Sequence, residues 1–243
     1  MKIPVVEGVI DRRILANFRI DPEILKNHLP APFVPKLING YGMGGICLIR
    51  LKNIRPLWAP KFLSLSSENA AHRFAVEWED EGVMKEGVFI PRRDSSSWMN
   101  SVLGGRLFPG VHHYAEFIVR ESGFDYFVEM TAKDGSAHVL VDAKIANSIP
   151  STSIFSSIKD CSTFFERGSL GYSSTGSPQV YDGLELKVFD WKVQPLKIER
   201  VESSYFSNEK VFPKGSTEFD CALLMVDIRH QWHGREELCC ASA

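Results

Sequence analysis

Apolar and polar residues alternate along most of this chain, with the period of two that places successive side chains on opposite faces of a β-strand. Asn39-Gly40 and Asp134-Gly135 are dipeptides that tight turns require. The pattern predicts strands over Val9–Ile20, Ile46–Leu51, Arg73–Trp78, Val83–Ile90, Val111–Arg120, Phe124–Thr131, His138–Ala146, Leu184–Trp191, Lys197–Tyr205 and Phe219–Ile228. We expect an α+β fold of mainly antiparallel strands, with a closed or strongly curved, barrel-like sheet and a few peripheral helices, because closure removes exposed edges and creates an interior pocket.

Three short helices are predicted from the residues that start and stop them. Capping aspartates and serines stand at their expected starts, and prolines or glycines follow their expected ends. The predicted spans are Asp21 to His28 or Leu29, Asp94 to Gly104-Gly105, and Ser157 to Arg167. The Ser- and Gly-rich segment Gly171–Gly183 is the most loop-like part of the chain, and we expect a lid or a crossover there.

The chain is long enough to bury one large core. Its 243 residues are 44% hydrophobic and 24% charged, and no repeat or clear linker divides them. We expect a single domain over residues 1–243, with a core over residues 9–230 and a flexible C-terminal tail over residues 234–243. Cys239 and Cys240 are expected to be incidental features of that tail.

Charge and cysteine usage exclude several classes of function. The net charge is −2, with 28 Lys and Arg against 30 Asp and Glu, so the excess of basic residues that nucleic-acid binding needs is missing. The N-terminal sequence has no apolar run of the kind found in signal peptides, and no stretch of about eighteen consecutive apolar residues occurs in the sequence. We therefore expect a cytoplasmic protein without a membrane partner. The five cysteines contain no CxxC pair, which favours a reducing compartment. We expect no metal and no cofactor.

The segment Gly87–Phe117 combines charged, aromatic and glycine residues in a way that neither a solvated loop nor a plain core strand requires. The serines Ser95–Ser97 lack a Gly-x-Ser-x-Gly setting and are expected to cap a helix rather than act as nucleophiles. We expect the functional site in this segment, whose informative residues are Arg92, Arg93, Asp94, Trp98, Gly104, Gly105, Arg106, His112 and His113.

Two further segments carry a resemblance to a known superfamily. The run Asn17–Leu25, followed by Leu29-Pro30-Ala31-Pro32, resembles the strand-to-helix opening of acetoacetate decarboxylase-like proteins, in which an aromatic-Arg-x-Asp unit precedes a helix ending in Leu/Val-Pro-x-Pro. Ser67-Glu68-Asn69 falls by spacing where that family carries its active-site glutamate. Together with Gly87–Phe117, these segments make residues 9–230 similar to the uncharacterised YqjF-like branch of the superfamily.

The resemblance implies a β-barrel-like fold with an enclosed site, but the decarboxylase chemistry does not carry over. Acetoacetate decarboxylase forms a Schiff base on one of two adjacent lysines, whose pKa is lowered by the cationic neighbour. The corresponding segment is Phe108–His113, and Gly110 and Val111 stand where the two amines would be. Lysine-dependent decarboxylation is therefore not expected, unless Lys85, Lys144 or another lysine reaches the cavity from a different strand.

Glu68, His112 and His113 are the candidate catalytic residues. A carboxylate inside a barrel must be paired or protonated, so Glu68 is a candidate acid, base or ligand anchor; the alternative is a surface acid in a polar turn. Adjacent strand residues point to opposite faces, so one histidine faces the interior. The apolar row through Ala115 favours His113, whereas alignment with the missing lysine favours His112. Either histidine is an acid/base near neutral pH or a packing residue.

The candidate ligand-binding residues are Arg92, Arg106, Arg19 and Trp98. Arg92 and Arg93 offer a fork for a carboxylate or phosphate, with at most one of them facing inward and Arg92 favoured. The alternative is that the pair brackets a solvated turn or forms a salt bridge with Asp94. Arg106 follows a Gly-Gly pair and precedes an aromatic residue, so it either closes on a ligand or caps the preceding helix.

Further arginines lie on the first predicted strand. Arg19 belongs to the resemblance motif, and its alternative role is an ion pair with Asp21 or Glu23. Arg12 and Arg13 occur near the position where the decarboxylases carry an arginine, although the spacing is shifted by one or more residues.

Three functions fit these residues. The first is binding, and acid/base transformation without a Schiff-base lysine, of a small organic acid or keto compound in the barrel interior, with lyase or isomerase chemistry. The second is a non-catalytic small-molecule binding or sensing module. The third is an oligomeric interaction protein, a homo-oligomer whose interface includes Trp58, Trp98 and Trp232.

Overall fold

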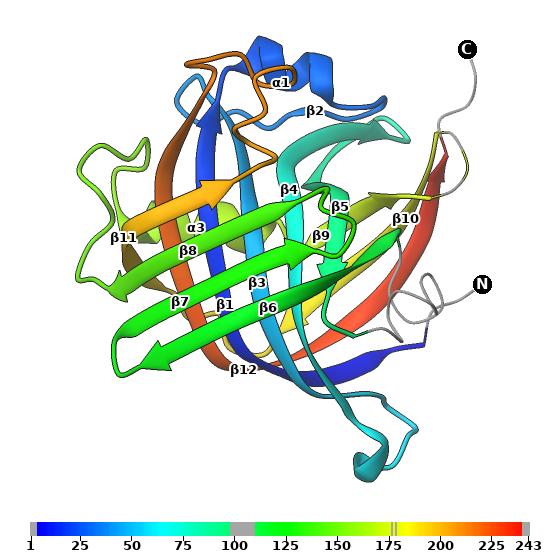
Figure 1. Cartoon of the computed structure of the whole chain (residues 1–243). Coiled ribbons are helices and arrows are strands. Elements are labelled where there is room, and N and C mark those ends of the chain that lie inside the picture. The colour runs from blue at the N-terminus through cyan, green and yellow to red at the C-terminus, as the bar shows by residue number, and fades with distance from the viewer. Residues whose placement is uncertain (1–3, 98–109, 176, 178, 240–243) are drawn as a thin grey trace.

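The chain folds mainly into long β-strands (Figure 1). The structure is a computed structural model, and it describes residues 4–97, 110–175, 177 and 179–239. In chain order the elements are β1 (Val6–Ile20), α1 (Pro22–His28), β2 (Val34–Pro35), β3 (Gly42–Pro56), the 3₁₀ helix η1 (Lys61–Leu63), β4 (Leu65–Asp80), β5 (Val83–Ser95), β6 (His112–Ser122), β7 (Asp125–Ala132), β8 (His138–Ile145), α3 (Ile158–Arg167), β9 (Leu170–Ser174), β10 (Val180–Val188), β11 (Gln194–Ser203) and β12 (Thr217–Cys239).

The described strands form one hydrogen-bonded sheet in the order β10-β9-β5-β6-β7-β8-β11-β12-β1-β3-β4-β2. Two additional pairings, β4 with β5 and β10 with β12, join strands that are distant in this order and close the sheet into two rings. The small ring consists of β1, β3, β4, β5, β9, β10 and β12. The large ring consists of β1, β3, β4, β5, β6, β7, β8, β11 and β12. Strands β12, β1, β3, β4 and β5 belong to both rings, and we call them the shared wall.

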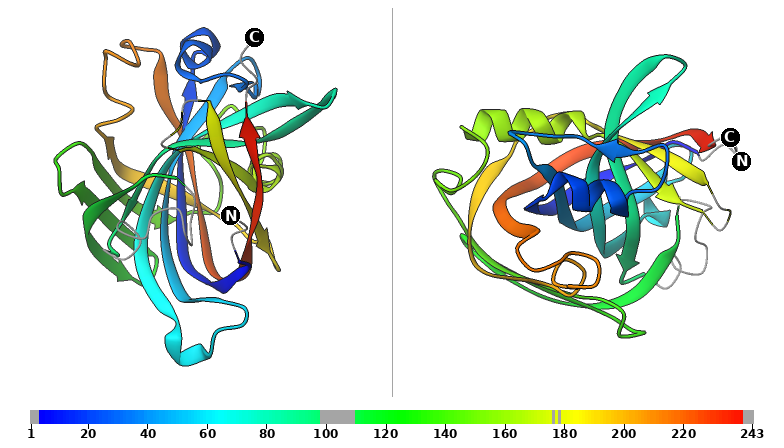
Figure 2. Two further views of the ribbon diagram at one scale, coloured as in Figure 1. Left: turned by 90° about the vertical axis from the view of Figure 1, so that its right-hand side faces the viewer. Right: turned by 90° about the horizontal axis from the view of Figure 1, so that it is seen from above.

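The mainly antiparallel, strongly curved sheet confirms the fold class expected from the sequence. Figure 1 shows β6, β7, β8 and β11 on one side of the shared wall and α3 on the other. Seen from above in Figure 2, α1 and the loop between β11 and β12 lie over one end of the large ring. A hydrogen bond of 2.7 Å between His28 Nε2 and Tyr205 Oη joins α1 to that loop.

Both faces of the shared wall are buried. On one face Ile14, Leu48 and Leu224 belong to the core of the large ring, and on the other Leu15 and Cys47 belong to a second core that α3 covers. A strand that buries both faces requires a near-continuous apolar run instead of alternation. This requirement accounts for the apolar runs 46–49 in β3 and 221–225 in β12, whose residues are all buried.

The described helices have the ends that the sequence predicts. The Asp21 side chain accepts hydrogen bonds from the backbone N–H groups of Glu23 and Ile24 at the start of α1. The Ser157 side chain accepts one from Asp160 at the start of α3, and Gly168 follows its last residue. The two predicted turns are also confirmed: Asn39 and Gly40 both have positive φ, and Gly135 has φ of 70° between β7 and β8.

The helix expected from Asp94 is corrected at its start. Asp94 and Ser95 are the last residues of β5. The Asp94 carboxylate pairs with Arg92 instead of capping a helix, and Ser95 Oγ donates to Asn69 Oδ1 at 2.8 Å. Backbone pairing with β4 and β6 thus extends the strand through residues of the types that are common at helix starts. Residues 98–104 of the expected helix lie outside the described residues.

Two expectations for irregular segments are also corrected. The segment Gly171–Gly183 contains most of β9 and the start of β10, which pair with each other and with β5 or β12. Residues 234–239, expected in a C-terminal tail, are the last part of β12, where Arg235 pairs with Gly183 and Leu238 with Tyr181. A polar sequence such as this one is held in a strand by backbone hydrogen bonds to an edge partner, which side-chain patterns do not report.

His72 is enclosed by the core of the large ring. It is fully buried, its ring lies 4.7 Å from that of Tyr205, and neither ring nitrogen has a hydrogen-bond partner among the described residues. Burial, followed by the charge of Arg92, lowers the pKa of His72 to about 3. His230 is also buried, and burial lowers its pKa to about 4.

These histidines predict a loss of stability in mild acid. The pKa of His72 is lower in the folded protein than in the unfolded chain, so the unfolded chain binds the extra proton, and unfolding free energy falls as pH drops from about 6.5 to 4. His72→Phe should flatten this part of the curve, measured by urea unfolding, by up to about 1.4 kcal/mol per pH unit. His138→Phe, at a more exposed histidine, is the control. A His72→Phe curve parallel to that of the wild type would contradict the assignment.

Candidate functional site

A cavity of about 420 Å³ lies inside the small ring, against the face of the shared wall that points away from the large ring. Alternate residues of β1, β3 and β4 form its floor, including Leu15, Cys47 and Ala71. Phe165 of α3 and Leu184 of β10 lie among the residues that enclose it. The cavity is therefore bounded by strands from both ends of the chain, which the sheet brings together.

Three arginines line this cavity, and their hydrogen bonds go to neutral atoms. Arg13 Nε donates to Cys47 Sγ at 3.3 Å, and Arg13 Nη1 lies 3.8 Å from Met225 Sδ. Arg73 Nη2 donates to Asn17 Oδ1 at 2.6 Å, and Arg93 Nε donates to Ser173 Oγ at 3.2 Å. Within the described part of the chain, none of the three guanidinium groups forms a salt bridge with a carboxylate.

Burial shapes the electrostatics of these arginines. The Arg73 side chain packs with its guanidinium carbon 5.0 Å from the centre of the Phe165 ring, and the residue is only 5% exposed. Burial lowers the pKa of Arg73 and of Arg93 to about 10 each. Both groups still carry a proton at neutral pH. The lining also contains the carboxylates of Asp94, Glu166 and Glu185, of which Asp94 pairs with Arg92 and Glu185 with Arg235. None of the three pairs with Arg13, Arg73 or Arg93 in the described part of the chain.

Strand register places the three arginines around Cys47. Arg93 on β5 lies opposite Ala71 on β4, Ala71 lies opposite Cys47 on β3, and these residues form one row across the sheet. Arg13 lies opposite Ile49, two residues along β3 from Cys47. Arg73 lies opposite Gly45, two residues in the other direction. The cations thus flank the middle of the cavity floor from three sides.

His112 lines the cavity and His113 does not. His112 is the first residue of β6 and pairs with Arg93 in the parallel ladder between β5 and β6. His113 Nδ1 lies 3.5 Å from Asp134 Oδ2, and its side chain is 35% exposed. The structure thus places the two adjacent histidines in different surroundings, and His112 shares the cavity with the arginines.

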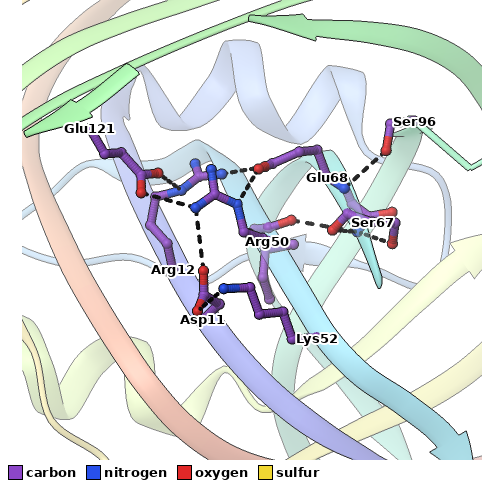
Figure 3. A network of polar contacts seen from close by, with 10 residues as sticks. Asp11, Arg12, Arg50, Lys52, Ser67, Glu68, Ser96 and Glu121 are labelled. Atoms are coloured by element: carbon purple, nitrogen blue, oxygen red, sulfur yellow. Dashed lines mark hydrogen bonds and ion pairs between the residues drawn. The ribbon is translucent and has the colours of Figure 1, made fainter. Parts of the chain in front are cut away.

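Glu68 lies in a separate ion-pair network, shown in Figure 3. Its carboxylate pairs with Arg12 and, at 2.5 Å, with Arg50 Nε. Both arginines also contact Glu121 of β6, each at 2.9 Å. Burial alone would lower the pKa of Arg50, but the hydrogen bonds and charges of Glu68 and Glu121 outweigh it, so the pKa is raised. The network ties β1, β3 and β4 of the shared wall to β6 across the large ring.

The described arginines predicted to bind a ligand also have protein partners. Arg92 donates two hydrogen bonds to Asp94, from Nε to Oδ2 at 2.9 Å and from Nη2 to Oδ1 at 2.7 Å. The Asp94 side chain is fully buried. Arg19 pairs with Glu218 at 2.6 Å and donates to the carbonyl of Thr152 at 2.8 Å, which corrects the expected ion pair with Asp21 or Glu23. Neither arginine lines the cavity.

Two predicted ligand-binding residues, Trp98 and Arg106, lie outside the described residues. In the part that the structure describes, no three His, Cys, Asp or Glu side chains cluster as metal ligands would. The same part contains no helix long and apolar enough to span a membrane.

The arginines that line the cavity are only partly predicted from the sequence. Arg93 shares a predicted ligand fork with Arg92, which is favoured over it, Arg13 is named only beside Arg12, and Arg73 is named only as the start of a predicted strand. The alternation of side chains along a strand is the signal that identifies Arg13 and Arg93. If Arg12 and Arg92 have structural partners on one face of the sheet, the residue after each of them points to the other face. Arg73 is identified only by the register that places it beside the floor.

Comparison with protein families gives a match over most of the chain. The family DUF2071, described as "Uncharacterized conserved protein (COG2071)", matches residues 10–222. The chain belongs to this family. Comparison with curated proteins finds no match.

Solved structures show which fold this DUF2071 member shares. An acetoacetate decarboxylase-like enzyme from Sphingomonas wittichii RW1 superposes with a TM-score of 0.59 at 10% identity, covering 99% of this chain and 94% of that one. Acetoacetate decarboxylase from Legionella pneumophila gives 0.59 at 12% identity, with coverage of 98% and 88%. The enduracididine biosynthesis enzyme MppR complexed with pyruvate gives 0.57 at 9% identity, with coverage of 97% and 91%. The likeness confirms the acetoacetate decarboxylase-like fold.

The sequence resemblance matches Gly110 and Val111 of this DUF2071 protein to the lysine pair of the decarboxylases. Gly110 has φ of 89°, and a Cβ there would come within 2.7 Å of the Ser173 side chain, so the backbone is closely packed against β9. Val111 is 58% exposed. The described lining of the cavity contains one lysine, Lys187, which lies 3.7 Å from Glu185. Lys85 and Lys144 are not among the lining residues.

The Glu68 network predicts a large cost for removing its central charge. Glu68→Gln leaves the Arg12 guanidinium, only 1% exposed, with one carboxylate partner fewer, and should lower the unfolding free energy by about 3 kcal/mol. Glu218→Gln removes a 66% exposed carboxylate from Arg19 and should cost less than about 1 kcal/mol. Urea unfolding of both variants checks the difference, and equal costs would contradict a bracing role for Glu68.

Proposed function

We propose that this protein binds a small organic acid of the 2-oxo or 3-oxo acid class in the small-ring cavity and catalyses acid/base chemistry at the carbon beside its carbonyl group. The arginines Arg13, Arg73 and Arg93 hold the carboxylate, and His112 moves the proton. The reaction belongs to the lyase or isomerase type and uses no Schiff-base lysine.

One observation carries the proposal: three guanidinium groups line a cavity, and none has a carboxylate partner among the described residues. An ion removed from water costs several kcal/mol unless an opposite charge and further hydrogen bonds compensate it. A bound carboxylate supplies both, since arginine presents parallel N–H donors that match carboxylate geometry. A cavity of about 420 Å³ beside these three guanidinium groups is thus suited to an anion of the size of a small organic acid.

The acid/base part of the proposal is supported by the position of His112. Its ring shares the cavity with Arg93, so a proton can be moved beside a group that binds the anion. Imidazole titrates near neutral pH and therefore serves as acid and as base. Among fold neighbours, MppR has been solved with pyruvate and with the condensation product of pyruvate and imidazole 4-carboxaldehyde, which directs the choice of probe to keto acids.

For the remaining predicted site residues we propose structural roles. Glu68 braces the large ring through Arg12 and Arg50. Arg92 neutralises the buried Asp94. Arg19 connects the loop that contains Thr152 to β12, because it donates to the Thr152 carbonyl and pairs with Glu218. Each guanidinium already has a carboxylate partner, so binding an anion would require that pair to open.

Ligand titration tests the binding part. Pyruvate should bind the wild type, and Arg93→Met should weaken its affinity by about tenfold or more, because a charge-assisted hydrogen bond is worth about 1.5–3 kcal/mol. Arg200→Met removes an arginine that is 61% exposed, and should leave the affinity unchanged. Methyl pyruvate, which lacks the charge, should not bind measurably. Equal affinities for Arg93→Met and the wild type, in isothermal titration, would contradict the proposed site.

Proton exchange tests the catalytic part. In D₂O the wild type should accelerate exchange of the methyl protons of pyruvate, and His112→Gln should lower that rate about a hundredfold, within the range for loss of a general acid/base. Pyruvate affinity should change little, because the carboxylate contacts remain. Proton NMR follows the exchange. Binding of pyruvate to the wild type without exchange would instead identify a binding module.

A further inference from the structure

Cys47 stands at the centre of the cavity floor. It lies in the middle of β3, is 7% exposed, and faces the cavity rather than the large ring. Its Sγ accepts the hydrogen bond from Arg13 Nε at 3.3 Å. Arg93 lies in the same row of the sheet, two strands away, with only the small side chain of Ala71 between them. The sulfur is therefore beside the place where the arginines would hold a carboxylate.

Cys47 lies among three arginines that have no carboxylate partner in the described part of the chain. Arg73 lines the cavity and is only 5% exposed. Its Nε has no hydrogen-bond partner among the described residues. This donor is an observation independent of the thiol and indicates an anionic ligand. Reactive cysteines in proteins lie near basic groups and can be reached by a reagent. Cys47 is buried but lines the cavity, and Arg13 donates a hydrogen bond to its sulfur.

Other nucleophiles in the described lining are less well placed. Lys187 is 52% exposed on β10 and lies near Glu185. Ser169 follows the end of α3, and the strand register does not place it beside any of the three arginines. Cys161 and Cys221 lie 3.7 Å apart, are fully buried, and do not line the cavity. Cys47 is thus the thiol that a bound molecule can reach.

We propose that Cys47 adds reversibly to the carbonyl carbon of a 2-oxo acid held by the arginines, an inference that rests on the proposed function and narrows its substrate class. The Sγ–C bond forms as the C–O π bond breaks, and the thiol proton passes to the former carbonyl oxygen, giving a thiohemiketal. The guanidinium groups stabilise the negative charge that develops on that oxygen during the addition. The reverse step releases the acid unchanged, so no oxidant or reductant is required.

Competitive alkylation tests whether an anion is delivered to Cys47. The Cys240→Ser variant, which keeps one reference thiol at the exposed Cys239, is treated with limiting iodoacetate or iodoacetamide. Labelling of Cys47 and Cys239 is quantified by peptide mass spectrometry. These reagents share a leaving group and differ in charge. The labelling ratio of Cys47 to Cys239 should be about tenfold higher with iodoacetate, because a positive cavity concentrates anions. Pyruvate should protect Cys47 and not Cys239.

The covalent step has its own readout. With [2-¹³C]pyruvate, the wild type should show a protein-bound resonance of a tetrahedral carbon that Cys47→Ser lacks, while Cys47→Ser still binds pyruvate in the titration. No bound tetrahedral resonance, or a Cys47 labelling ratio that is the same for the two reagents, overturns the inference. Because pyruvate affinity is measured separately, these results leave the proposed function standing, and only a failure of pyruvate to bind removes both.

Discussion

The burial of both faces of the shared wall is the constraint on which the rest of the structure depends. Strands β12, β1, β3, β4 and β5 belong to two rings at once, so their buried side chains are divided between two interiors. One interior contains the core of the large ring and the Glu68 network, and the other contains the cavity. Backbone hydrogen bonds along the long β1–β3 and β1–β12 ladders fix which residue enters which interior, since a shift by one residue would exchange the faces.

This alternation gives neighbouring residues different tasks. Arg12 pairs with Glu68 on one face, whereas the hydrogen bonds of Arg13 go to sulfur atoms beside the cavity. Arg92 binds Asp94, and Arg93 faces the cavity with a serine as its partner. In each pair one guanidinium has a carboxylate partner and the next has none among the described residues. A buried cation without a counter-ion lowers the stability of the empty protein, and such a cost is typical of a functional site.

The sequence predicted the fold better than the site. Alternation, turn dipeptides and caps located most strands, α1 and α3, because these signals are local. The β-strand at Asp94 and Ser95 and the pairing of residues 234–239 depend on partners distant in the chain, and local residue preferences could not reveal them. Glu68 was selected for its chemistry, yet Arg12 and Arg50 occupy its carboxylate. The arginines of the cavity are separated by up to 80 residues, and only the sheet register shows that they surround Cys47.

If the three arginines without carboxylate partners bind the carboxylate of a small keto acid, a crystal of the protein soaked with pyruvate should show the acid on the cavity floor. Its carboxylate should lie within hydrogen-bonding distance of at least one guanidinium among Arg13, Arg73 and Arg93, with its carbonyl carbon turned towards Cys47. Density for pyruvate at the Glu68 network instead, with this cavity empty, would contradict this assignment.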